Sequence, residues 1–167
     1  MSNRIFISSA FLLGIIIIQS TLFQYIAVYE VIPNLYLIYL VFTSFYNGGL
    51  HGTVCGFATG LVEDAVSIAP LGFHGVIKTV IGSLYSSLSG IVILDRAIMP
   101  MIFVLVATVL NRILAFGVVS IFSLSVPVHS VFSRFFLIEI IYNTLLTPPV
   151  FFICHKIRDR MDRGRGL

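Results

Sequence analysis

Among the polar side chains inside apolar stretches of the sequence, four could do chemistry: Lys78, Arg112, Glu139 and Asn143. Charged groups inside a membrane are costly, so they usually face protein or a water-filled cavity. Arg112 and Glu139 fall at similar depths in two consecutive apolar segments, which predicts an ion pair between antiparallel neighbours. Such a pair belongs either to a structural polar seam or to a path for a ligand or a proton.

The polar residues continue along one face of each of these two segments. Glu139, Asn143 and Thr147 follow one another at a spacing of four, and so do Thr108 and Arg112. In a helix, residues four apart lie on the same face. The two faces therefore predict a seam that extends over more than one turn.

Lys78 lies near the predicted outer side of its segment, and Glu63 and Asp64 follow the preceding one. This spacing predicts a contact between Lys78 and Asp64. The polar content of the membrane region is thus biased toward its outer half. That bias fits a cavity that opens outward and fits a lid closed by charges equally well.

The closest approach to a metal site is the pair His51 and Cys55, at a spacing of four. A metal needs further ligands from neighbouring elements, and the remaining histidines are dispersed along the chain. The sequence contains no HExxH, GxSxG or P-loop pattern. We therefore expect no enzyme, no metal and no cofactor.

Small residues at a spacing of four mark one face on each of two consecutive helical segments. They are Gly48, Gly52, Gly56 and Gly60 in the first and Gly82, Ser86 and Gly90 in the second. In lipid, helices associate through close approach of their backbones. Either the two faces pack on each other within the chain, or one of them receives a helix from another protein.

The elements that position these residues must be membrane helices. The chain has 167 residues, of which 58% are apolar and 10% charged, whereas a soluble domain is about 45–50% apolar and about 25% charged. A membrane helix needs roughly 20 residues, so six of them leave no room for a soluble domain. We predict six segments, at about 5–29, 35–46, 50–62, 73–94, 98–122 and 131–154, followed by a polar tail at 155–167.

The charges give these segments an orientation. With the N-terminus inside, most basic residues lie on the inner side, and the outer loops hold Glu30, Glu63 and Asp64 but no basic residue. This is the positive-inside asymmetry of membrane proteins, and it predicts that both termini are cytoplasmic. The basic tail is either a topology anchor on anionic lipid or a docking site for a cytoplasmic partner. A net charge of only +3 argues against nucleic-acid binding.

The central third of the chain, about Pro33 to Gly90, carries a specific run of residues. Pro33-Asn34-Leu35 opens a short helix, the glycines at 48–60 lead into Leu61-Val62-Glu63-Asp64, and Pro70-Leu71-Gly72 follows. Together with the six segments and the basic tail, this run resembles the rod shape-determining protein MreD family. The family commonly shows Pro-Asp-Leu, so Asn34 replaces an acid here, whereas Asp64 matches the acidic residue of the family.

The resemblance implies a non-catalytic inner-membrane component of the bacterial cell-elongation machinery. Members associate with MreC, a protein with one membrane helix and a periplasmic part. Both work with the actin-like MreB and with the peptidoglycan synthases of lateral wall growth. The implied fold is an all-α bundle of six transmembrane helices at 1–154, similar to the S component of energy-coupling-factor transporters, with a basic cytoplasmic tail at 155–167.

Two functions stay open on the sequence. The glycine faces favour a scaffold that binds the single helix of a partner. The alternative is a membrane-embedded, solute-binding subunit of a transporter, whose pocket Lys78, Arg112, Glu139 and Asn143 would line. A fold shared with a transporter subunit does not decide between them, because a fold does not assign a function.

Overall fold

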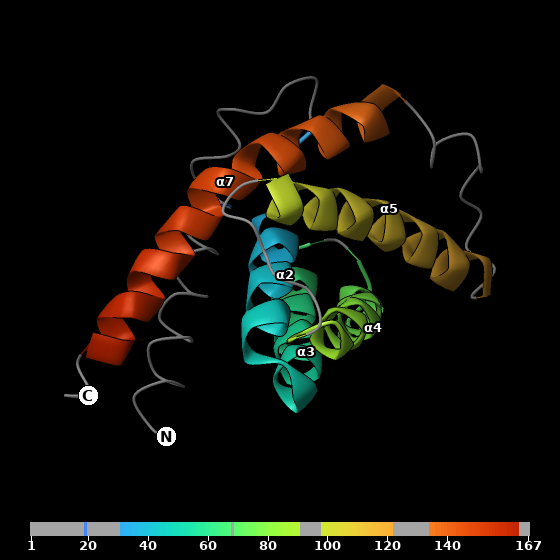
Figure 1. The fold of residues 1–167 in the computed structure, drawn as a ribbon. Helices are drawn as coiled ribbons and strands as arrows, with labels where there is room; N and C mark the ends of the chain where they lie inside the picture. Colours follow the sequence, from blue (N-terminus) through green and yellow to red (C-terminus); the bar gives the residue numbers. More distant parts are fainter. Residues whose placement is uncertain (1–18, 20–30, 68, 91–97, 122–133, 164–167) are drawn as a thin grey trace.

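The computed structural model describes residues 19, 31–67, 69–90, 98–121 and 134–163. This part of the chain is all-helical (Figure 1). Its five helices are α2 (Leu35–Asn47), α3 (Gly49–Val66), α4 (Phe73–Ser87), α5 (Ile98–Ile121) and α7 (Arg134–Arg163). The first predicted span, 5–29, lies outside the described residues apart from Gln19.

The central helix is α2. Ten of its 13 residues are buried, as expected for a helix that is apolar on all sides. It begins after Asn34, whose Oδ1 accepts a hydrogen bond from the backbone N of Leu37 at 2.9 Å. Helices α3, α4, α5 and α7 all pack against α2. Residues at its N-terminus can therefore reach side chains from every other helix described.

The most extensive helix–helix contact in the described structure joins α3 to α4. A Cβ atom at Gly56 would lie 2.2 Å from the carbonyl oxygen of Lys78, and one at Gly82 would lie 2.2 Å from that of Gly52. No side chain fits at these distances. The backbones of α3 and α4 therefore touch, which is the geometry that small residues permit in membrane helices.

The boundaries of α3 and α4 differ from the predicted segments. Helix α3 continues beyond the segment at 50–62 to Val66, so Glu63 and Asp64 belong to its last turns instead of a following loop. Helix α4 ends at Ser87, short of the segment end at 94. Residues 88–90 form a turn, in which Gly90 has a φ of +80°.

Helices α5 and α7 are the two in the described structure that are long and apolar enough to cross a membrane, at Ile98–Ile121 and Phe135–Arg160. They pack against each other. Helix α7 contains Pro148 and Pro149, which remove two N–H donors, and Figure 1 shows a bend in this helix. Because α7 continues to Arg163, the polar tail predicted at 155–167 begins as the last turns of a helix.

Candidate functional site

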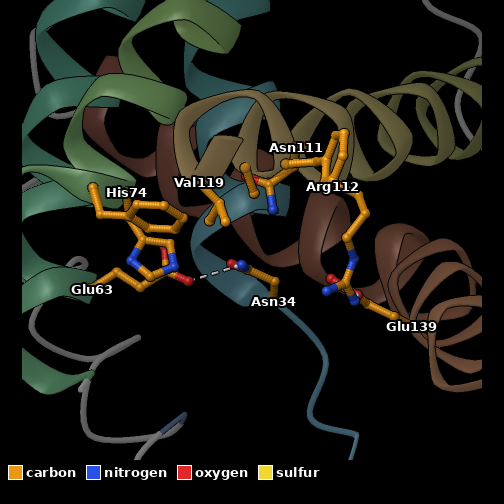
Figure 2. A pocket seen from close by; sticks show the side chains of 10 residues that line it. Asn34, Glu63, His74, Asn111, Arg112, Val119 and Glu139 are labelled. Carbon is orange, nitrogen blue, oxygen red and sulfur yellow. Dashed lines mark hydrogen bonds and ion pairs between the residues drawn. The ribbon is translucent and has the colours of Figure 1, made fainter. Parts of the chain in front are cut away.

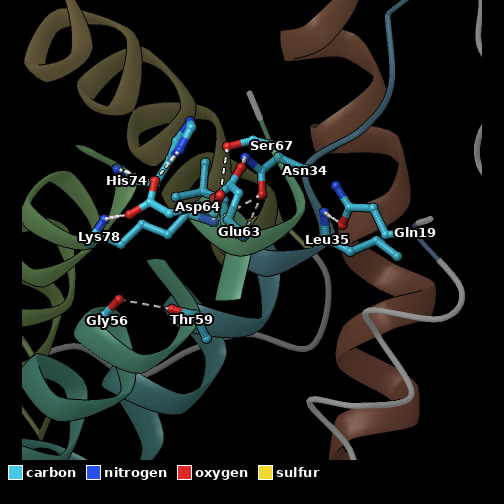
Figure 3. Close-up of polar contacts among 12 residues, drawn as sticks. Gln19, Asn34, Leu35, Gly56, Thr59, Glu63, Asp64, Ser67, His74 and Lys78 are labelled. Atoms are coloured by element: carbon cyan, nitrogen blue, oxygen red, sulfur yellow. Dashed lines mark hydrogen bonds and ion pairs between the residues drawn. The ribbon is translucent and has the colours of Figure 1, made fainter. Parts of the chain in front are cut away.

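A polar cluster joins the N-terminus of α2 to α3 and α4 (Figure 3) and also reaches α7, with Asn34 at its centre. The side-chain Nδ2 of Asn34 donates to Glu63 Oε1 at 3.0 Å, and its Oδ1 accepts from Lys78 Nζ at 3.4 Å. Its backbone N donates to Asn143 Oδ1 at 2.8 Å. One residue thus connects four helices through polar contacts.

Lys78 is fully buried within this cluster, with 0% of its surface exposed. Its ammonium group forms an ion pair with Glu63 and lies 4.8 Å from the centre of the Tyr36 ring. A buried charge with a carboxylate partner and an aromatic face is compensated on two sides. The sequence predicts a contact between Lys78 and Asp64, and in the structure the ion-pair partner of Lys78 is the neighbouring acid Glu63.

The carboxylate of Asp64 binds the backbone at the start of α4. Its carboxylate accepts hydrogen bonds from the backbone N–H groups of Gly72 at 2.8 Å, His74 at 2.9 Å and Gly75 at 3.2 Å. Its Oδ1 also lies 2.8 Å from Nδ1 of His74. The first N–H groups of a helix lack intrahelical partners and attract negative charge. Asp64 therefore fixes the connection between α3 and α4.

The hydrogen bonds to the start of α4 lower the pKa of Asp64, which lies beyond the predicted span at 50–62. Burial raises the pKa of its carboxyl, but the hydrogen bonds from His74, Gly75 and Gly72 outweigh burial and hold the pKa below the ordinary value of 3.8. Gly72 supports the same turn, because its φ of +96° is a conformation that favours glycine. The backbone oxygen of Pro70 accepts from Phe73 N at 3.1 Å.

A second polar cluster joins α5 to α7. Arg112 forms an ion pair with Glu139, as the depths of the two residues predict. One turn away on each helix, Asn143 Nδ2 donates to Thr108 Oγ1 at 3.1 Å. Because Asn143 also accepts from the backbone of Asn34, it links this cluster to the first. The same face continues to Thr147, whose hydroxyl donates to the Asn143 carbonyl at 2.7 Å.

A cavity of about 370 Å³ lies between the two clusters (Figure 2). Its polar wall consists of Asn34, Glu63, His74, Asn111, Arg112 and Glu139. Its apolar wall consists of Phe73, Ala115, Phe116 and Val119. Of the four residues that the sequence places in a solute pocket, Arg112 and Glu139 line this cavity, whereas Lys78 and Asn143 are fully buried in protein contacts.

The glycine faces lie against each other within the chain. A Cβ at Gly52 would lie 1.8 Å from Ser86 Oγ, and one at Gly60 would lie 2.5 Å from the Cα of Gly75. Gly75 is absent from the predicted face, although it precedes Gly82 by seven residues, which places both on one side of a helix. The spacing of Gly75 and Gly82 in the sequence could therefore have placed Gly75 on this face.

Two of the predicted face glycines serve turns instead. Gly48 lies between α2 and α3 with a φ of +61°, and a Cβ there would lie 2.8 Å from Ser89 Oγ. Gly90 follows α4, and a Cβ there would meet no heavy atom of the described structure within 4 Å. A side chain is therefore disfavoured at both positions by backbone conformation, and at Gly48 by crowding as well.

The remaining candidates are separate from these clusters. His51 is exposed at the start of α3, and Cys55 Sγ lies 3.2 Å from Thr43 Oγ1. The described residues contain no group of three or more His, Cys, Asp or Glu side chains placed to hold a metal ion. Sequence reasoning missed Asn111, which lines the cavity beside Arg112.

Comparison with known proteins gives one match. The family model described as rod shape-determining protein MreD matches residues 2–157. No curated protein and no solved structure matches the chain. The matched range includes both polar clusters, the α3–α4 glycine contact and the cavity.

Proposed function

The chain belongs to the rod shape-determining protein MreD family, and on this premise we propose that it is a non-catalytic scaffold of the bacterial cell-elongation machinery. In this role it binds MreC through that protein's single membrane helix. Together with MreB and the wall synthases, the two proteins support lateral peptidoglycan synthesis. The observation that carries the proposal is the family match over residues 2–157.

We further propose that the chain is a multi-pass protein of the inner membrane. Its fold in this proposal is a bundle of six transmembrane helices, like the S component of energy-coupling-factor transporters, and both of its termini are cytoplasmic. Two long apolar helices, Ile98–Ile121 and Phe135–Arg160, support the membrane location. The absence of basic residues from the predicted outer loops supports the orientation.

The α3–α4 contact limits where a partner helix can bind. Gly52, Gly56 and Gly60 face the backbone or side chains of α4 at distances that exclude even a methyl group. A second helix cannot reach these glycines without first separating α3 from α4. The proposal therefore places the partner on another surface of the bundle.

Co-purification tests the scaffold. The tagged full chain is extracted from native membranes in a mild detergent, and the proteins bound to it are identified by mass spectrometry, with an untagged strain as the control. We expect a single-span protein with a large periplasmic part, accompanied by wall synthases. An ATPase pair together with a membrane coupling subunit would instead identify a transporter subunit and contradict the proposal.

A further inference from the structure

The walls of the cavity between α3, α4, α5 and α7 are balanced in charge. Glu63 is paired with Lys78, and Glu139 is paired with Arg112. His74 lies against Asp64 through its Nδ1. A charged ligand would meet no net opposite charge on these walls, and a buried charge without its partner is strongly unfavourable. An uncharged ligand leaves all of them intact.

The same walls also contain hydrogen-bonding groups that are available to a ligand. The side-chain oxygen of Asn111 is buried and has no hydrogen-bond partner in the described structure. A buried acceptor without a partner costs free energy, so it favours a ligand with an O–H or N–H donor. Arg112 has five N–H donors, and its ion pair uses the NH2 nitrogen. A ligand acceptor can bind the others.

The apolar wall of the cavity offers surface for the apolar part of a ligand. The rings of Phe73 and Phe116 line the cavity together with Ala115 and Val119. The volume of about 370 Å³ is within the range of about 300–1,000 Å³ that is usual for small-molecule sites. Polar groups that converge beside aromatic surface are also found in such sites.

We propose that this cavity binds the ring of an uncharged sugar. Hydroxyl or amide groups of the ring donate to Asn111 Oδ1 and accept from Arg112, while its C–H face packs on Phe73 and Phe116. The ring belongs either to a free sugar or to the headgroup of a glycolipid. This site does not depend on the scaffold function, because all the residues that form it belong to this one chain.

The test uses the full chain in nanodiscs of phosphatidylcholine, which has no sugar headgroup and cannot compete for the site. Binding of glucose and of N-acetylglucosamine is followed by saturation-transfer NMR, with empty nanodiscs as the background. Glucuronate and glucosamine are the charged counterparts of these probes. We expect saturable binding of the two neutral sugars and at least tenfold weaker binding of the charged ones.

Three variants on α5 locate the binding. Asn111→Leu removes the free acceptor and should weaken binding about fivefold to tenfold, as expected for one neutral hydrogen bond. Ala115→Phe fills the cavity and should abolish the signal. Gly117→Ala is the matched control, because a Cβ there meets no heavy atom of the described structure within 4 Å, and it should bind as the wild type does. Size-exclusion profiles confirm that each variant is folded.

Native mass spectrometry distinguishes the two sources of the ring. The chain is extracted from its own membranes in a detergent without a sugar headgroup. A bound hexose-bearing lipid that Ala115→Phe loses would assign the site to a glycolipid, even where free sugars do not bind. The proposal is overturned if neither free sugar nor glycolipid binds the folded wild type. It is also overturned if charged sugars bind equally well or if Ala115→Phe leaves binding unchanged.

Discussion

At the scale of single residues, Asn34 shows why an amide suits the centre of the first polar cluster. It donates to Glu63 and accepts from both Lys78 and the backbone of Leu37. A carboxylate at this position accepts the same bonds but cannot donate to Glu63 unless one of the two acids is protonated. The amide therefore lets Glu63 keep its charge for Lys78.

Exchanging the amide and the acid tests this role. Asn34→Ala removes the helix cap, which alone is worth about 0.5–2 kcal/mol, together with both side-chain bonds. Asn34→Asp keeps the helix cap, although its carboxylate lies against that of Glu63. Because the cap is kept, this variant should lower the melting temperature less than Asn34→Ala. Adding Glu63→Gln to Asn34→Asp exchanges the two groups, so that an amide at position 63 donates to a charged carboxylate at position 34. Thermal unfolding in detergent should show the double variant to be more stable than Asn34→Asp alone.

The pair of Arg112 and Glu139 is suited to a double-mutant cycle. Arg112→Ala and Glu139→Ala should each destabilise the fold by about 1.5 kcal/mol, the lower end of the range for a hydrogen bond to a charged group, because 35% of the Arg112 side chain is exposed. The double variant should cost less than the sum of the two single changes. Strictly additive losses in thermal unfolding would show that the two side chains do not interact.

Asp64 should make stability depend on acid pH. Its pKa is lowered in the folded chain, so its contribution is fully present above about 3.8 and is lost as the pH falls through the lowered pKa. Melting temperatures measured from neutral pH down to acid pH should fall for the wild type in this window. Asp64→Asn should be less stable at neutral pH and should show a weaker fall. A wild-type profile identical in slope to that of the variant would contradict this role.

At the scale of elements, the contact between α3 and α4 depends on missing side chains. Hydrophobic attraction does not drive helices together in lipid, so the gain comes from backbones that approach closely. Gly56 faces the carbonyl group of Lys78, which is backbone and cannot swing aside as a flexible side chain would. The two helices therefore act as one rigid hairpin that also presents Lys78 to Glu63.

Adding side chains at selected glycines tests the hairpin. Gly56→Ala should cost about 1–3 kcal/mol, as overpacking usually does, and Gly56→Leu should lower the folded yield sharply. Gly117→Ala in α5 is the control and should unfold like the wild type, because its Cβ enters open space in the described structure. Folded yield is measured by fluorescence-detected size-exclusion chromatography. Normal yield and normal partner co-purification for Gly56→Leu would show that α3 and α4 need no close contact.

At the scale of the whole molecule, hydropathy and glycine spacing predict which segments become helices. Segments 35–46 and 98–122 agree with α2 and α5 within a residue or two. The spacing of Arg112 and Glu139 predicts their ion pair because a short connection makes their helices neighbours. These predictions need only local periodicity and the depth of a residue in the membrane.

Contacts set by the rotation of one helix against another could not be predicted in this way. Glu63 and Asp64 are adjacent in sequence but point toward different partners, Lys78 and the start of α4. Hydropathy does not distinguish two adjacent acids, and only the turn before α4 decides which of them binds it. Of the pocket residues that the sequence suggests, only Arg112 and Glu139 line the cavity, because its other walls come from helices whose rotation the sequence does not show.

The burial of Lys78 also has a consequence for how the protein is made. In the proposed six-span fold α4 crosses the membrane, and a lysine costs up to about 2.5–3.5 kcal/mol in a helix that enters the bilayer alone. Lys78 lies in the first half of α4, which has only 15 residues to offset that cost. The carboxylate that neutralises Lys78 is on α3, which leaves the ribosome first. We therefore expect α3 and α4 to enter the lipid from the translocon together, as a pair. In a glycosylation-mapping assay, α4 alone should insert poorly, α3–α4 should insert well, and Glu63→Ala should return the hairpin to poor insertion.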